Sequence, residues 1–205
     1  MMVYTDKIVQ KIVDKLKEKD VWENTIFIFT SDNGTHFSVI SDTNHGKVTG
    51  GKGFSINTGN HVPMIAGWRA KMKKGRVFEN LIDFSDVLPT LGEAAGADMS
   101  NYKMDGKSFL NILKGVETST KDEVFIHYSP RWGAKKHNRW VMNGEYKLYR
   151  DGRYFKTLND TLEKNPLTIV SENENELKKH FQKLIDEKEK EFPYNRNDTI
   201  YNPLK

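Results

Sequence analysis

The sequence contains no cysteine, which excludes disulfide bonds and leaves the redox compartment of the chain open. It also has no apolar run near the roughly twenty residues that a helix needs to span a bilayer. An excess of charge of one sign is missing as well, because 32 basic and 28 acidic residues give a formal net charge of only +4. This balance is compatible with an anionic ligand but is far from that of a nucleic-acid-binding protein.

The first half of the chain has the pattern of an α/β protein. Its 205 residues suffice for one core, or for one core with a small appendage. Within residues 4–19, Ile8, Ile12 and Leu16 recur at helical spacing, which predicts a helix that covers one face of a sheet. The apolar run at residues 25–29 is typical of a parallel strand that is buried on both faces.

The second half of the chain has a different pattern from about residue 123. Short strands are predicted at residues 124–128, 139–142, 145–150 and 153–156. The dipeptides Asn143-Gly144 and Asp151-Gly152 are hairpin signals, so we expect an antiparallel meander. An amphipathic helix within residues 173–191 is expected to pack on this sheet. We therefore divide the chain into an α/β core portion, residues 1–115, and a small α+β subdomain, residues 116–205.

The most informative segment is residues 25–34, where the apolar run leads into the turn Ser-Asp-Asn-Gly. Open α/β sheets place their chemistry just beyond such strands, here at Asp32 and Asn33. A carboxylate and a neutral amide oxygen suit Ca²⁺, which accepts several oxygen ligands in tolerant geometry. Taken alone, the same four residues also make a good turn with no further role.

Further motifs follow this turn along most of the chain. They are Gly-Lys-Gly at 51–53, Val-Pro at 62–63, Val-Leu-Pro-Thr-Leu at 87–91, Asp-Gly-Lys-Ser-Phe-Leu at 105–110 and Tyr-Lys-Leu-Tyr at 146–149. In this order they resemble the sulfatases of the alkaline-phosphatase-like superfamily. The resemblance implies an α/β fold, namely part of an alkaline-phosphatase-like sandwich with a small C-terminal antiparallel sheet and helix.

The resemblance also implies roles for individual residues. Lys52 matches the lysine that contacts the sulfate ester and helps to stabilise charge on its oxygens, so it is the expected catalytic and substrate-binding residue. Asp32 and Asn33 match metal ligands. Zinc-using relatives more often have a histidine at the position of Asn33, so this asparagine favours the calcium-dependent sulfatases.

Three histidines are candidates for substrate binding. His36 and His45 lie between the predicted metal-binding turn and Lys52, where either would line a substrate pocket. Single histidines in loops are, however, more often solvated than functional. His61 stands where the family commonly has an arginine before Val-Pro. It would replace a permanent cation by a group that titrates near neutrality.

One family motif is missing from this sequence. Sulfatases carry Cys/Ser-x-Pro-x-Arg, whose cysteine or serine is oxidised to formylglycine, and no serine here is followed by that pattern. The paired aspartates that complete the calcium site also belong to a part of the family that precedes residue 1. The chain thus resembles the C-terminal half of a sulfatase, and we predict negligible sulfatase activity for these residues alone.

Three interpretations remain open. The chain is a truncated sulfatase, one subunit of a split enzyme, or a non-catalytic module that binds sulfated glycans or another anion. The first two imply a sulfate ester substrate once the other half is present, and none implies nucleic acid or a membrane span. Strand edges that lack their usual neighbours also predict self-association. The sequence identifies neither the particular sulfate ester nor the localisation of the protein.

Overall fold

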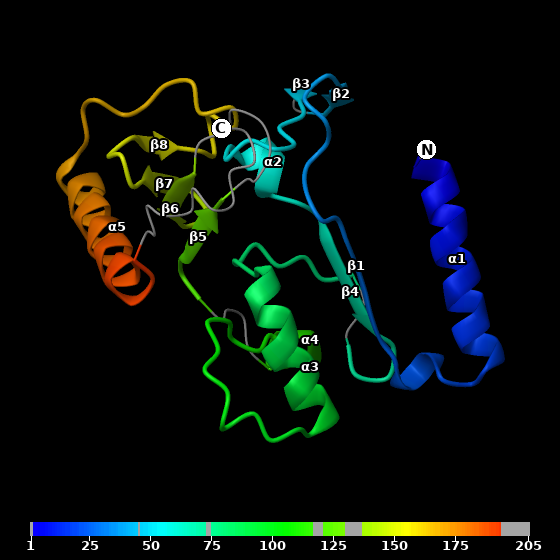
Figure 1. Ribbon diagram of the computed structural model, residues 1–205. Coiled ribbons are helices and arrows are strands. Elements are labelled where there is room, and N and C mark those ends of the chain that lie inside the picture. The colour runs from blue at the N-terminus through cyan, green and yellow to red at the C-terminus, as the bar shows by residue number, and fades with distance from the viewer. Residues whose placement is uncertain (1, 45, 73–74, 117–120, 130–136, 194–205) are drawn as a thin grey trace, which may run out of the picture. The chain divides into compact units, whose positions relative to one another are not determined.

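The computed structural model describes residues 2–44, 46–72, 75–116, 121–129 and 137–193 (Figure 1). Its helices are α1 (Met2–Glu18), α2 (Asn57–Asn60), α3 (Val87–Ala95), α4 (Leu110–Lys114) and α5 (Glu172–Glu191), with the 3-10 helices η1 (Trp22–Asn24) and η2 (Phe84–Asp86). Its strands are β1 (Ile26–Thr30), β2 (Ile40–Thr43), β3 (Gly46–Thr49), β4 (Met64–Trp68), β5 (Val124–Tyr128), β6 (Asn138–Met142), β7 (Tyr146–Tyr149) and β8 (Tyr154–Lys156). None of the described helices is long and apolar enough to cross a membrane.

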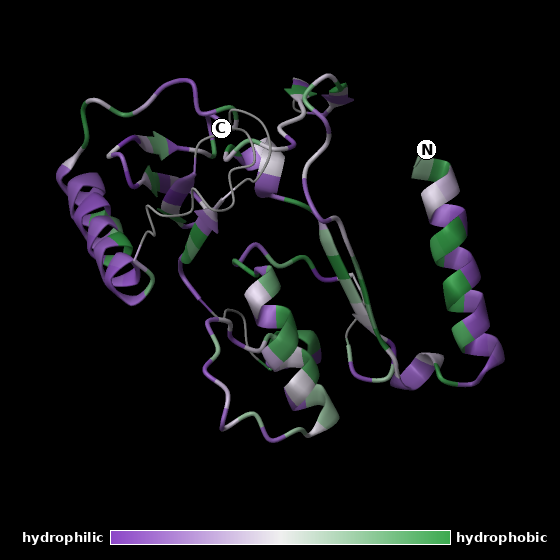
Figure 2. Ribbon diagram, viewed as in Figure 1, coloured by the Kyte–Doolittle hydropathy of each residue, from purple (hydrophilic) through white to green (hydrophobic). Residues whose placement is uncertain are grey.

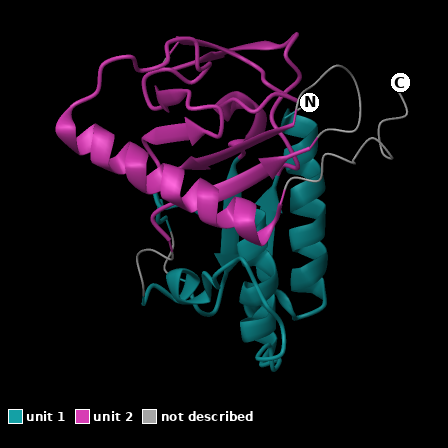
Figure 3. Ribbon diagram, turned by 60° about the vertical axis from the view of Figure 1, so that its left-hand side comes forward, with its two compact units in different colours: residues 1–30, 63–120 teal, residues 31–62, 121–205 magenta. Residues whose placement is uncertain are grey.

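The chain forms two compact units, coloured separately in Figure 3. Unit 1 comprises residues 1–30 and 63–120, and unit 2 comprises residues 31–62 and 121–205. The loop that contains the predicted site therefore groups with the C-terminal sheet. The division of the chain into two domains at residue 115 stays a prediction.

Unit 1 contains a pair of strands, β1 and β4. They run antiparallel, with Ile26 opposite Trp68 and Thr30 opposite Met64. The predicted parallel pairing is therefore wrong for this neighbour, and the residues of β1 are half-buried rather than buried. An apolar run indicates burial but not strand direction, which is set here by the excursion through residues 31–62. Self-association through the edges of this pair stays a prediction.

The core of unit 1 lies around α4. Its buried side chains are Phe109, Leu110, Ile112 and Leu113, and apolar side chains of β1 and β4 pack against them. Helix α1 does not share in this core, because none of its residues is buried. Ile8 and Ile12 remain 43% and 47% exposed. The predicted helix is present, but the predicted packing of its apolar side on a sheet is not observed.

Two of the motifs in unit 1 hold each other in place. The fully buried carboxylate of Asp86 accepts hydrogen bonds from the backbone N–H groups of Asp83 at 2.9 Å and Lys107 at 2.7 Å. Thr90 accepts one from the N–H of Phe109 at 2.9 Å. The Pro-Thr-Leu helix and the Asp-Gly segment are thus joined by buried hydrogen bonds, which gives both motifs a structural role.

Unit 2 contains the antiparallel meander that the sequence predicts. The strand order is β5-β6-β7-β8, and each neighbouring pair runs antiparallel. Asn143 closes the β6–β7 hairpin, since its side-chain oxygen accepts hydrogen bonds from the N–H groups of Glu145 and Tyr146 at 2.9 and 2.7 Å. Such Asx turns are why asparagine marks hairpins.

Helix α5 begins at a capping box, in which Ser171 and Glu174 each bond the other's backbone N–H. Figure 2 shows that hydrophilic residues dominate this helix. Its apolar stripe is narrow, and Phe181 and Ile185 are fully buried against the sheet residues Val141 and Leu148. The predicted packing of this helix on the meander is confirmed, as is the mixed α/β class with small antiparallel sheets and a C-terminal helix.

Candidate functional site

The predicted metal-binding turn and the predicted sulfate-contacting lysine lie on adjacent stretches of backbone. Directly after Asn33, the N–H of Gly34 donates to the carbonyl oxygen of Gly59 at 2.9 Å. The N–H of Lys52 donates to the carbonyl oxygen of Thr35, also at 2.9 Å. Both bonds lie within unit 2, so residues 31–62 form one folded loop in which the turn and Lys52 are neighbours.

Glycine is required where these backbone segments cross. A Cβ atom on Gly34 would overlap the carbonyl oxygen of Thr58, and one on Gly59 would overlap the carbonyl oxygens of Gly51 and Phe54. The obstructing atoms are backbone oxygens, which cannot swing aside as a side chain can. Close backbone approach is thus the physical reason for glycine at positions 34 and 59.

The chemistry of the turn suits a hard cation. Asp32 is exposed and Asn33 is half-buried, and the carbonyl oxygen of Asn33 accepts a hydrogen bond from the Ser31 hydroxyl at 2.7 Å. Within the described ranges there is no cluster of three or more His, Cys, Asp or Glu residues that could hold a metal ion. The two side chains match the oxygen donors that Ca²⁺ takes but are fewer than the six to eight oxygens of a complete shell.

The candidate histidines differ in their surroundings. His36 is exposed, and its Nδ1 lies 2.8 Å from the Ser38 hydroxyl while its ring lies 4.1 Å from that of Phe37. His61 is exposed at the end of α2. His45 lies outside the described residues. Both described histidines belong to the same loop as Lys52, and a role in substrate binding stays a prediction for all three.

Part of this loop is more regular than the sequence indicates. Residues 34–59 are rich in Gly, Ser, Thr and Asn, which predicts a connection without regular structure, yet β2 and β3 form a hairpin within them. Beside this hairpin, the rings of Phe37 and Phe54 meet edge to face at 5.9 Å, and both remain about half exposed. The hairpin was not predicted because its strands are largely exposed, and exposed strands carry few of the alternating apolar residues that mark a strand in a sequence.

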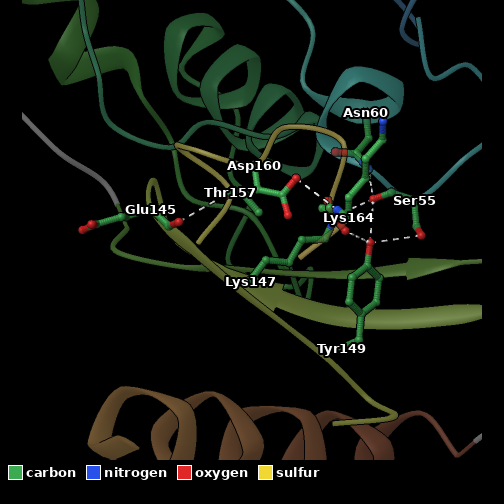
Figure 4. Close-up of polar contacts among 9 residues, drawn as sticks. Ser55, Asn60, Glu145, Lys147, Tyr149, Thr157, Asp160 and Lys164 are labelled. Atoms are coloured by element: carbon green, nitrogen blue, oxygen red, sulfur yellow. Dashed lines mark hydrogen bonds and ion pairs between the residues drawn. The ribbon is translucent and has the colours of Figure 1, made fainter. Parts of the chain in front are cut away.

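A buried polar cluster ties the Lys52 loop to the C-terminal sheet (Figure 4). The carbonyl oxygen of Ser55 accepts hydrogen bonds from Asn60 Nδ2 at 2.7 Å, from Lys147 Nζ, and from the Tyr149 hydroxyl at 3.2 Å. The Tyr149 hydroxyl also lies 3.1 Å from the Ser55 hydroxyl. Two residues nearer to Lys52, the carbonyl oxygen of Gly53 accepts a hydrogen bond from the hydroxyl of Tyr128 at 2.9 Å.

The charge inside this cluster is compensated by one carboxylate. Lys147 Nζ lies 2.8 Å from Glu163 Oε1, and the two side chains are only 0% and 2% exposed. Burial lowers the pKa of Lys147 to about 8, although the Glu163 carboxylate opposes the shift. Burial also raises the pKa of Tyr149, and the nearby Glu163 charge adds to that increase. At neutral pH the cluster therefore holds an ion pair and a neutral phenol.

Sequence reasoning missed this cluster. It interpreted residues 146–149 only as a family strand, because the partners of that strand lie far away in the chain. A local signal was present: Lys147 stands among apolar and aromatic residues in a strand whose four residues are all buried. A buried lysine needs a partner, but the sequence does not single out Glu163 from the other acidic residues.

The low pKa of Lys147 predicts how stability depends on pH. The folded chain releases this proton near pH 8 and the unfolded chain near 10.5, so between these values the folded state binds fewer protons. The contribution of Lys147 to the free energy of unfolding therefore rises with pH. From pH 8 to pH 10, wild type should gain about 2 kcal/mol of unfolding free energy relative to Lys147→Met. Urea unfolding of both proteins checks this, and parallel pH profiles would contradict it.

Comparisons with protein families match most of the chain. Residues 1–97 match the sulfatase family, and residues 50–192 match the family described as N-sulphoglucosamine sulphohydrolase, C-terminal. An arylsulfatase from Hemicentrotus pulcherrimus is 29% identical over 143 residues, which are 69% of this chain and 25% of that protein. The ulvan-active sulfatase of Formosa agariphila is 29% identical over 162 residues, 78% of this chain and 27% of the relative. The chain thus spans about a quarter of the length of these relatives.

Solved structures show the same fold. One is a protein in complex with its substrate D-glucosamine-2-N,6-O-disulfate, with a TM-score of 0.71, 22% identity, and coverage of 96% of this chain and 40% of that one. Another is the PsFucS1 sulfatase from Pseudoalteromonas sp., with a TM-score of 0.71, 25% identity, and coverage of 94% and 42%. The chain therefore has the architecture of part of these structures.

Proposed function

This chain belongs to the sulfatase family, and from that premise we propose that residues 31–62 form its share of a sulfate ester site. One observation carries the proposal. The backbone hydrogen bond from Lys52 to Thr35 holds the lysine beside the Asp32–Asn33 turn. A cation for the sulfate oxygens and two oxygen ligands for a metal ion are then available in one loop.

Lys52 would bind the sulfate group. Its side chain is exposed, and an ammonium group is a compact charge that can approach tetrahedral oxyanions closely. The same charge favours negative charge that develops on the ester oxygens during S–O cleavage. The flanking glycines, Gly51 and Gly53, keep bulk away from its backbone. Lys52 would thus contribute to both binding and catalysis.

Asp32 and Asn33 would supply two oxygen ligands to Ca²⁺. When bound, the ion supplies a Lewis acid for a sulfate oxygen. The nucleophile would come from a formylglycine outside this sequence, so we propose that these residues bind a sulfate ester but do not hydrolyse it alone. One relative is an ulvan-active sulfatase, and one protein of similar structure is in complex with its substrate D-glucosamine-2-N,6-O-disulfate. Sulfated saccharides are therefore the first ligands to test, beside inorganic sulfate.

Replacing Lys52 with alanine tests this site. We expect Lys52→Ala to weaken the binding of glucosamine disulfate by at least about tenfold, since a charge-assisted hydrogen bond contributes roughly 1.5–3 kcal/mol. Isothermal titration calorimetry with the 205-residue chain in the presence of Ca²⁺ measures the affinity.

Lys47→Ala is the matched control. Lys47 is also an exposed lysine of this loop, in β3, so its replacement changes the net charge equally. Affinity should stay within about twofold of wild type, because a single exposed charge acts weakly through screened solvent. Equal losses in the two variants would show that the anion responds to overall charge and would reject the proposed site.

A further inference from the structure

The backbone just beyond Lys52 is held by side chains from a different part of the chain. Tyr128 of β5 binds the carbonyl oxygen of Gly53, and Lys147 and Tyr149 of β7 bind that of Ser55. Figure 4 shows Lys147 and Tyr149 reaching from the sheet towards Ser55. Each contact fixes a carbonyl group within three residues of Lys52, so the sheet restrains the backbone from which the lysine projects.

This arrangement is costly for a purely structural support. Burying a charged pair carries a large desolvation penalty for each ion, and apolar residues of similar volume often stabilise a core equally well. Glu163 also adopts φ of 52°, in the left-handed region that side chains disfavour. Asp160 supports this turn by accepting hydrogen bonds from the N–H groups of Lys164 and Asn165 at 3.0 and 2.7 Å.

The direction in which the polar atoms of Lys147 and Tyr149 point distinguishes these residues from ordinary core residues. Buried Thr157, in the same subdomain, donates its N–H and hydroxyl to the carbonyl oxygen of Glu145 at 2.9 and 3.2 Å, and so joins neighbouring residues of the sheet. Lys147 and Tyr149 instead direct their polar atoms out of the sheet, into the loop at Ser55. Geometric precision of a loop backbone is what such a polar network can supply and an apolar core cannot.

We infer that Lys147, Tyr149 and Glu163 are positioning residues, which hold the loop so that Lys52 presents its ammonium group to the sulfate of the ester. Tyr128 acts with them at Gly53. None of the four is proposed to touch the reacting atoms. The inference rests on the proposed role of Lys52 as the sulfate-binding residue, but its structural half, the restraint of the loop, can be tested separately.

Tyr149→Phe is the variant of choice, because it removes one hydroxyl and keeps the ring, which packs edge to face on Phe155 at 5.9 Å. The readout is hydrogen exchange of the backbone amides of Lys52 and Phe54, which are bonded to Thr35 and Gly51. We expect both amides to exchange about three- to tenfold faster, the range that corresponds to loss of one net hydrogen bond.

Thr157→Val is the control, because it removes a buried hydroxyl of unit 2 that donates its hydrogen bond to Glu145 and not to Ser55 or Gly53. This control should lower global stability. Hydrogen exchange at the amides of Lys52 and Phe54 should nevertheless match that of wild type when the two proteins are compared at the same free energy of unfolding. Unchanged exchange in Tyr149→Phe, or equally faster exchange in Thr157→Val, would overturn the inference, because the cluster would then be only a part of the core.

Ligand affinity separates this inference from the proposed function. Tyr149→Phe should weaken the binding of glucosamine disulfate about threefold or more, and Tyr128→Phe should act in the same direction. Faster hydrogen exchange in the loop with unchanged ligand affinity would overturn the inference that these residues position Lys52. If Lys52→Ala itself leaves affinity unchanged, the proposed function fails, and positioning for sulfate fails with it, whereas the exchange data still decide whether the cluster restrains the loop.

Discussion

Glu163→Ala is expected to lower the free energy of unfolding by about 3–5 kcal/mol, because it strands the buried ammonium group of Lys147 without a counter-charge. Lys147 is fully buried, and Glu163 Oε1 is 2.8 Å away. The variant also removes a hydrogen bond of the Tyr149 hydroxyl. Urea unfolding near pH 7 measures the effect, since there Lys147 is still charged in the wild type.

The matched control is Glu145→Ala. Glu145 also pairs with a lysine at 2.8 Å, Lys156, but the two side chains are 44% and 36% exposed. Exposed pairs contribute at most about 1 kcal/mol, so the control should lose far less stability than Glu163→Ala. Comparable losses would mean that burial does not determine the cost, and this would contradict the argument for the cluster.

A double variant separates the stranded charge from other effects of the alanine. Lys147→Met keeps the length of the side chain and removes its charge, so adding it to Glu163→Ala should restore about 1–2 kcal/mol. If the double variant is instead less stable than Glu163→Ala, the loss does not arise from the unpaired ammonium group.

Local patterns predicted the strands and the helix of the C-terminal part of the chain well. The meander and α5 were predicted to within a few residues, because hairpin signals such as Asn143-Gly144 and the amphipathic spacing of the helix are local patterns. The direction of β1 was predicted wrongly as parallel, because an antiparallel or parallel partner leaves the same apolar run in the strand. The exposure of α1 was not predicted either, because periodicity marks an apolar side but not what covers it.

The candidate site was predictable only in part. The order of family motifs pointed to Asp32, Asn33 and Lys52, and a backbone hydrogen bond joins Lys52 to Thr35, two residues after Asn33. The supporting cluster had no comparable signal, since Lys147 and Ser55 are separated by 92 positions in the sequence. Contacts of this range depend on the tertiary fold, and neither propensity nor local spacing encodes them.

Gly34→Ala should disrupt the Lys52 loop and lower the free energy of unfolding by about 3 kcal/mol, at the upper end of overpacking effects. A methyl group at this position would overlap the backbone carbonyl of Thr58. Relief requires the backbone to move, which would stretch the hydrogen bond from Gly34 to Gly59 and displace the neighbouring contact between Thr35 and Lys52. We therefore expect a loss of ligand affinity of at least about tenfold together with the loss of stability.

Gly144→Ala is the control for this prediction, because a Cβ atom there would meet nothing within 4 Å. This glycine lies in unit 2 as well, in the hairpin before β7, so the same chemical change is made in open space. Stability within about 0.5 kcal/mol of wild type and unchanged affinity are expected, as for most surface substitutions. If Gly34→Ala behaves like this control, the loop can yield at its tightest crossing, and close backbone packing does not hold Lys52 beside the Asp32–Asn33 turn.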